Sequence, residues 1–254
     1  QEVLAGYWRA PFIVGGLSGL LALWLRRYLS ETPVFQAMRE HRRLAEGLPI
    51  REVLATRRRN VARCLVLSWL LTVGIVVVIL MTPTLAQTTY GLAARDSLQA
   101  NMWATVALAF GCVLFGASAD RFGIDRVLLI GSVAMIVSAL MLYAVLTHAP
   151  RHFPWVYALT GLCVGTVGVV PAALVREFPP AIRYSGVSFS YNLAYAVSGG
   201  LTPIIVTLWI HSSPLAPAYY VVTVTAVVAA VVLSGLASPV ARENALSAGS
   251  ARAE

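Results

Sequence analysis

Long apolar runs alternate with short polar connections along the chain. Seven such runs hold no charged residue, and most are close to the roughly 20 residues that an α-helix needs to cross a bilayer. The first run is shorter, but Arg26 and Arg27 can reach the membrane surface and Tyr28 suits the interface, which extends that helix to about Leu29. The pattern predicts an all-α, polytopic membrane helix bundle with seven spans. They cover residues 10–25, 64–86, 98–119, 127–147, 153–175, 185–210 and 217–237.

One long polar stretch, residues 30–60, interrupts this pattern. Thr32-Pro33 and Leu48-Pro49 predict breaks between short amphipathic helices within it. Its arginines suit a solvated loop beside anionic lipid head groups. Nucleic-acid binding is not expected, because the basic residues are confined to connections between apolar runs. Residues 238–254 are expected to form a cytoplasmic tail.

The arginines are distributed unevenly between the two sides that seven spans define. If residues 30–60 lie in the cytoplasm, only Arg9, Arg95 and Arg151 of the 19 basic residues lie outside. This satisfies the positive-inside rule and predicts an outside N-terminus and a cytoplasmic C-terminus, in a cell membrane of the bacterial inner-membrane type. The cytoplasmic arginines would be Arg26, Arg27, Arg39, Arg42, Arg43, Arg51, Arg57, Arg58, Arg59, Arg63, Arg121, Arg126, Arg176, Arg183, Arg242 and Arg252.

The composition is typical of a membrane protein and argues against some kinds of cofactor and metal site. The chain is 58% hydrophobic and 12% charged, whereas a soluble domain is about 25% charged. All its basic residues are arginine, which excludes a retinal Schiff base because that linkage needs a lysine. Cys64, Cys112 and Cys163 lie singly in apolar runs without the spacing of metal ligands. We therefore expect neither a metal nor a cofactor.

The connection between the third and fourth runs is very short and charged. Gly123 permits a tight bend, Asp120 lies at one helix end, and Arg121 and Arg126 flank the start of the next helix. Charges at facing helix ends can pair in one conformation and separate in another. The pattern predicts a conformational latch on the cytoplasmic side. Its residues are Gly116, Asp120, Arg121, Gly123 and Arg126, together with Glu177 and Arg183 of a later connection.

That later connection, with two consecutive prolines, leads into a polar-studded sixth run. A helix in lipid has no water to satisfy polar side chains, so these should face other helices or a wet cavity. They are Ser188, Ser190, Tyr191, Asn192, Tyr195, Ser198 and Thr202.

The sequence resembles the major facilitator superfamily at these connections. The pattern Gly-x-x-x-Asp-Arg-x-Gly over residues 116–123 is similar to the second-half copy of that superfamily's cytoplasmic signature, although Ile124 and Asp125 here precede Arg126. Two further stretches resemble the metabolite:proton symporter family, which includes shikimate, citrate, α-ketoglutarate and proline/betaine carriers. They are Trp8-Arg9-x-Pro11-Phe12 with Arg26-Arg27-x-x-x-Glu31-Thr32-Pro33-x-Phe35, and Glu177-Phe178-Pro179-x-x-x-Arg183-Tyr184-Ser185-Gly186-Val187-Ser188-x-Ser190-Tyr191-Asn192 with Gly199-Gly200-x-x-Pro203.

The resemblance implies two six-helix halves that rock around a substrate at the bilayer midplane. Residues 1–29 would be the last helix of the N-terminal half, residues 30–60 the interdomain loop, and residues 61–237 the six-helix C-terminal half. The first five helices would be absent, so we expect an incomplete fragment that is inactive alone. Its partners would be the missing half, the lipid bilayer, protons and a small organic acid or zwitterionic metabolite. No carboxylate lies in a predicted span, so proton coupling would come from the missing half.

Polar side chains within the runs are candidates for lining the substrate path. Tyr191, Asn192 and Tyr195 share one helical face, and their donors suit an organic anion or polyhydroxylated acid. Interhelical hydrogen bonding is the alternative for each candidate. The full set is Tyr191, Asn192, Tyr195, Trp69, Thr72, Asn101, Thr105 and Thr166.

The fifth run carries two packing signals. Gly161 and Gly165 have the small-xxx-small spacing that predicts close helix contact. Pro171 predicts a kink.

Two other functional classes are alternatives. An integral membrane hydrolase or acyltransferase needs a nucleophile–base pair, a metal site or a His–carboxylate pair, but no His, Asp or Glu lies in a predicted span. A seven-helix receptor is suggested only by the number of spans, and the short cytoplasmic turns argue against it. The sequence therefore predicts a secondary transporter and not an enzyme.

Overall fold

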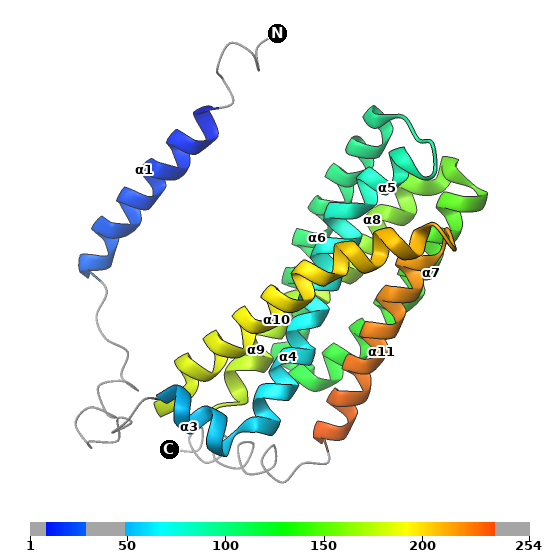
Figure 1. The fold of residues 1–254 in the computed structure, drawn as a ribbon. Helices are drawn as coiled ribbons and strands as arrows, with labels where there is room; N and C mark the ends of the chain where they lie inside the picture. Colours follow the sequence, from blue (N-terminus) through cyan, green and yellow to red (C-terminus); the bar gives the residue numbers. More distant parts are fainter. Residues whose placement is uncertain (1–8, 29–48, 237–254) are drawn as a thin grey trace. The chain divides into compact units, whose positions relative to one another are not determined.

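The computed structural model describes residues 9–28 and 49–236, which belong to two separate units of the chain. The first unit contributes α1 (Ala10–Leu25) and the 3-10 turn η2 (Arg26–Tyr28) (Figure 1). The second begins with α3 (Pro49–Thr56), which starts at the predicted break at Pro49. Most of the predicted interdomain loop and the predicted tail lie outside the described residues.

Six helices of the second unit are long and apolar enough to cross a membrane. Five of them contain one of the predicted runs, and the sixth overlaps the last run, whose final residue lies outside the described residues. No β-strand occurs in residues 9–28 or 49–236, so the all-α polytopic bundle is confirmed. The remaining predicted span is α1, a helix of 16 residues. The six are α4–η3–α5 (Arg58–Thr72, Val73–Met81 and Thr82–Thr88), α6 (Ala94–Phe122), α7 (Ile124–His148), η4–α8–η5–α9 (Pro150–His152, Phe153–Val164, Gly165–Val169 and Val170–Arg176), α10 (Pro180–Ile210) and α11 (Ala216–Leu236).

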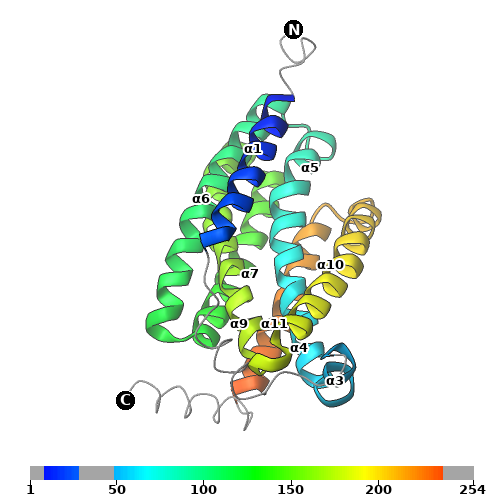
Figure 2. The same ribbon diagram turned by 90° about the vertical axis from the view of Figure 1, so that its left-hand side faces the viewer.

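Consecutive spans of the second unit run in opposite directions, so their connections alternate between the two ends of the bundle (Figures 1 and 2). Helix α6 packs on α8, α7 on α11, and α4 on α10. We call one end the arginine end; among described residues it holds Arg51, Arg57, Arg58, Arg59, Arg63, Arg121, Arg126, Arg176 and Arg183. The opposite end holds Arg95 and Arg151. The helix arrangement thus separates the arginines as the charge pattern predicts.

Helices α6 and α8 touch along their backbones. A Cβ atom on Gly161 would lie 2.1 Å from the carbonyl oxygen of Ala104, and one on Gly165 would lie 2.3 Å from the carbonyl carbon of Gly111. Only glycine leaves room for this approach, which confirms the close contact predicted from the spacing of Gly161 and Gly165.

Two of the spans are irregular near their middle. The first changes to a π-helix over η3, and the fourth to a 3-10 helix over η5. Segment η5 lies directly before α9, whose second residue is Pro171. Proline lacks an N–H donor and its ring clashes with the carbonyl four residues earlier, so the regular α-helical hydrogen bonds cannot continue through this turn. The α-helix is therefore interrupted next to the residue where the sequence predicts a kink.

Candidate functional site

Helix α10 has a narrow buried stripe and a polar flank. The stripe repeats every fourth residue and consists of Ile182, Gly186, Ser190, Ala194, Ser198, Thr202, Val206 and Ile210. Tyr191 and Tyr195 lie beside it, half-buried, with ring centroids 4.8 Å apart. Asn192 is exposed, and its Nδ2 donates to the Ser188 carbonyl of the same helix at 2.7 Å. We call Ser188, Tyr191, Asn192 and Tyr195 the polar flank.

The side of α10 on which Leu193, Val197 and Leu201 lie is apolar and exposed. On a helix these residues and the tyrosine pair fall on different sides of the buried stripe. The structure therefore brings Tyr191 and Tyr195 together, as predicted, on a flank that differs chemically from its neighbour.

Trp69 and Thr72, two further predicted lining residues, bind neighbouring helices. The Trp69 indole donates to the Tyr220 hydroxyl of α11 at 3.1 Å, and the Thr72 hydroxyl lies 2.8 Å from that of Ser198 in α10. Tyr220 also hydrogen-bonds Thr202 at 2.7 Å. These contacts join α4, α10 and α11 and use the polar groups that a lining role would direct at substrate.

Asn101 and Thr105 lie on α6, toward the end of the bundle opposite the arginine end. The Thr105 hydroxyl donates to the Asn101 carbonyl at 2.8 Å, and the Asn101 side-chain oxygen accepts from Tyr157 at 2.7 Å. Tyr157 also reaches the Val78 carbonyl of the π-helix at 2.7 Å. This hydroxyl network holds α6 and α8 to η3.

The sequence interpretation missed Tyr157, along with Tyr143, whose hydroxyl lies 2.8 Å from that of Thr82. Both tyrosines are fully buried in the bundle. The available signal was the position of single phenols inside otherwise apolar runs, since a phenol in lipid needs a partner.

Thr166 is buried in η5 and faces another helix rather than a cavity. A Cβ on Gly131 of α7 would lie 2.0 Å from its hydroxyl oxygen, which has no hydrogen-bond partner within the described part of the chain. Thr166 is thus placed apart from the polar flank of α10.

The predicted latch divides into two parts. Gly123 has φ +91°, as the tight turn requires, while Asp120, Arg121 and Arg126 are exposed and make no ion pair within the described ranges. The Arg121 guanidinium lies 5.4 Å from the Phe122 ring centre, and Gly116 has open space where a Cβ would be.

The ion pair at this turn belongs instead to Asp125, which departs from the superfamily pattern. It lies 3.5 Å from Arg176, across from the end of α9. This residue therefore links the two charged connections of the arginine end.

The other connection folds against the start of α4. The Glu177 carboxylate lies 3.2 Å from an Arg63 nitrogen and 3.1 Å from the Asn60 amide nitrogen. Arg183 donates to the Phe178 carbonyl at 3.1 Å. The buried Phe178 ring occupies the space where a side chain at Gly186 would lie. Glu177, Phe178, Arg183 and Gly186 therefore shape this turn.

At the opposite end, the Tyr90 hydroxyl donates to the Pro214 carbonyl. This joins the connection after α5 to that between α10 and α11. Burial raises the pKa of Tyr90 to about 12, so it stays protonated at neutral pH and can donate.

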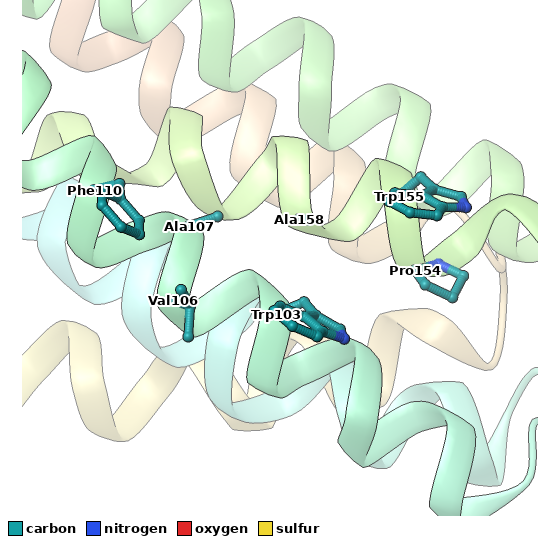
Figure 3. Close-up of a pocket in the computed structure, with 7 residues that line it drawn as sticks. All are labelled: Trp103, Val106, Ala107, Phe110, Pro154, Trp155 and Ala158. Carbon is teal, nitrogen blue, oxygen red and sulfur yellow. The ribbon is translucent and has the colours of Figure 1, made fainter.

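An apolar pocket of about 440 Å³ lies between α6 and α8 (Figure 3). Its walls include Trp103, Phe110 and Trp155, and Figure 3 shows the two indoles on the two neighbouring helices. It contains none of the predicted lining residues. A small polar solute needs several directed donors or acceptors, so the polar flank of α10 is the better candidate for substrate contact.

Known proteins with related sequences agree with this architecture. The profile described as "Major Facilitator Superfamily" matches residues 3–203. The citrate-proton symporter of Klebsiella pneumoniae is 31% identical over 80% of the chain and 46% of its own length, and that of Salmonella typhi is 32% identical over 79% and 46%. The glycine betaine/proline/ectoine/pipecolic acid transporter of Dickeya dadantii is 26% identical over 89% and 48%.

The chain thus spans about half the length of the known relatives that it matches. The profile match and the six helices that are long and apolar enough to cross a membrane indicate a multi-pass membrane protein of this superfamily. The chain belongs to the major facilitator superfamily, in which it is similar to the metabolite:proton symporters.

Proposed function

We propose that this chain forms one half of a carrier that moves a small organic acid or zwitterionic metabolite together with protons by alternating access. The relatives named as a citrate-proton symporter and a glycine betaine/proline transporter support this substrate range. Carriers of this architecture hold substrate near the midplane between two helical halves. Here residues 61–237 would be one half, residues 30–60 the connecting loop, and residues 1–29 the last helix of the other half.

The polar flank of α10 carries the proposal. Lipid leaves hydroxyl and amide groups without partners, yet Tyr191, Asn192 and Tyr195 lie outside the buried stripe in the middle part of a span. Their environment in the working carrier is therefore water, substrate or another protein segment. A wet path between two halves supplies all three.

The arginine end is proposed to face the cytoplasm. Nine arginines of the described second unit lie at this end, against Arg95 and Arg151 at the other, and arginine-rich connections stay in the cytoplasm. In this orientation the N-terminus lies outside and the tail inside.

One half carries half of a substrate site. We expect proteoliposomes that contain only the 254-residue chain to accumulate no radiolabelled citrate or glycine betaine when a proton gradient is imposed. Empty liposomes provide the background. Gradient-driven uptake above that background would refute the proposal that a second half is needed.

Cysteine labelling tests whether the polar flank of α10 is in contact with water. In a carrier that contains this chain and its other half, with native cysteines replaced, Asn192→Cys and Tyr195→Cys should react readily with a charged, membrane-impermeant thiol reagent. Leu193→Cys and Val197→Cys, at the same depth on the apolar side, should react at least tenfold more slowly, because thiols in lipid remain protonated and unreactive. Equal labelling on both sides would contradict the path assigned here.

A further inference from the structure

We propose that Glu177 is a proton-binding residue of this half, and that proton binding opens a clasp at the arginine end. The clasp consists of Asn60 and Arg63 at the start of α4, Glu177 between α9 and α10, and Gly235 in α11. In this view the carboxylate takes a proton from solvent, its charge is neutralised, and Arg63 loses its ionic partner. The sequence predicts that proton coupling comes from the other half, so this site is an addition to the proposed function.

The Glu177 carboxylate is enclosed by donors from α4. One Arg63 nitrogen lies 3.2 Å from Oε1 and 3.3 Å from Oε2, and Asn60 Nδ2 lies 3.1 Å from Oε2. The same Asn60 nitrogen donates to the Glu177 backbone carbonyl at 2.8 Å. Both charged side chains are largely buried, with 19% of Arg63 and 13% of Glu177 exposed. The pair therefore depends on each partner's charge more than an exposed pair would.

Arg63 is held on its other side by α11. A Cβ on Gly235 would lie 1.9 Å from an Arg63 guanidinium nitrogen, so the guanidinium occupies the space that glycine leaves open. Its Nε is buried and has no hydrogen-bond partner within the described part of the chain. The guanidinium is thus satisfied chiefly by Glu177. Removing that negative charge leaves a buried cation, which is relieved when Arg63 moves to water.

The surroundings favour protonation of Glu177. Burial raises its pKa, and the nearby Asp125 carboxylate raises it further; Arg63, the Asn60 hydrogen bond and Arg176 act in the opposite direction. Arg183, on α10, is engaged by the Phe178 carbonyl. As pH falls, Glu177 binds its proton at a higher pH than an ordinary glutamate, whose pKa is about 4.3. The clasp would be closed above this folded-state pKa and open below it.

Cys64 provides a built-in reporter of the clasp. It follows Arg63 directly and is fully buried. In the full chain in lipid nanodiscs, with Cys112→Ser and Cys163→Ser, we expect the alkylation rate of Cys64, relative to that of the unfolded chain, to become at least tenfold higher from about pH 8 to about pH 4. Each rate is divided by that of the unfolded chain at the same pH, which removes the titration of the thiol itself.

Three variants separate the clasp from general loosening. Glu177→Gln should react at one rate at every pH, equal to the fast rate of the parent chain at low pH. Asn60→Ala removes a donor to the carboxylate and should move the labelling transition to higher pH. Asp125→Asn, which breaks the more exposed pair with Arg176, should keep the pH dependence without an upward shift.

The proposal is overturned if Cys64 of the parent chain reacts at the same normalised rate at all pH values. It is equally overturned if Glu177→Gln retains the pH response, or if Asn60→Ala leaves the transition in place. Should Glu177→Gln fail to fold, Gly235→Ala must give fast, pH-independent labelling, because its methyl group displaces the guanidinium. None of these measurements uses substrate, so their outcome is independent of whether the carrier transports citrate or betaine.

Discussion

Replacing Gly161 with alanine should destabilise the six-helix unit by an amount on the order of 3 kcal/mol, the upper range for overpacking a tight core. The added methyl carbon would lie 2.1 Å from the Ala104 carbonyl oxygen, 2.8 Å from its carbonyl carbon and 2.9 Å from its Cα. All three are backbone atoms, so no change of side-chain rotamer relieves the clash. Helices α6 and α8 must separate, and the network of Tyr157 with Asn101 and Val78 that joins them to η3 separates with them.

The chain offers a matched control for this substitution. Gly116 lies in α6, the helix that Gly161 contacts, and has open space where a Cβ would be, so Gly116→Ala should leave stability unchanged or raise it by up to about 1 kcal/mol through helix propensity. Denaturant unfolding in detergent micelles, followed by circular dichroism, measures both variants. A Gly161→Ala protein as stable as the parent would show that the backbones do not touch as described.

The spans and the separation of arginines could be predicted because each depends on local sequence. A run of apolar residues long enough for the bilayer becomes a helix wherever it lies, and connections alternate sides once the spans are counted. Gly161 and Gly165 were also informative, because their spacing places both on one face. The helix that they contact could not be predicted, because it comes from a different part of the sequence.

The partners of polar side chains could not be predicted for the same reason. Thr72 binds Ser198, which lies 126 residues away, and Glu177 binds Arg63, which lies 114 residues away. Asp125 looked like an interruption of a motif, whereas in the structure it binds Arg176. A period of 3.6 residues shows which residues share a face, but the neighbour of that face is set by packing of the whole bundle.

These partners also divide the candidate lining residues into two groups. Trp69 and Thr72 make hydrogen bonds between helices that stabilise the α4–α10–α11 contact. Tyr191 and Tyr195 contact each other on the polar flank and remain half-buried. Substitutions in the first group should therefore change stability, and those in the second should change substrate affinity.

In the carrier proposed here, Tyr191→Phe and Tyr195→Phe should each lower substrate affinity by about 10- to 100-fold. That range corresponds to losing one hydrogen bond to a charged group, about 1.5–3 kcal/mol. Phenylalanine keeps the ring and so preserves the contact between rings whose centroids lie 4.8 Å apart. The measurement is the KM for gradient-driven uptake of citrate and of glycine betaine, with the amount of carrier in the membrane determined for each variant.

Two controls make this result specific to the polar flank. Leu193→Ala and Val197→Ala, on the apolar side of α10, should leave KM within about twofold, because they remove no donor. Trp69→Phe should lower stability with little change in KM, because its indole already donates to Tyr220. If Tyr191→Phe and Tyr195→Phe transport like the parent while Trp69→Phe raises KM, the substrate contacts α4 and not the polar flank of α10.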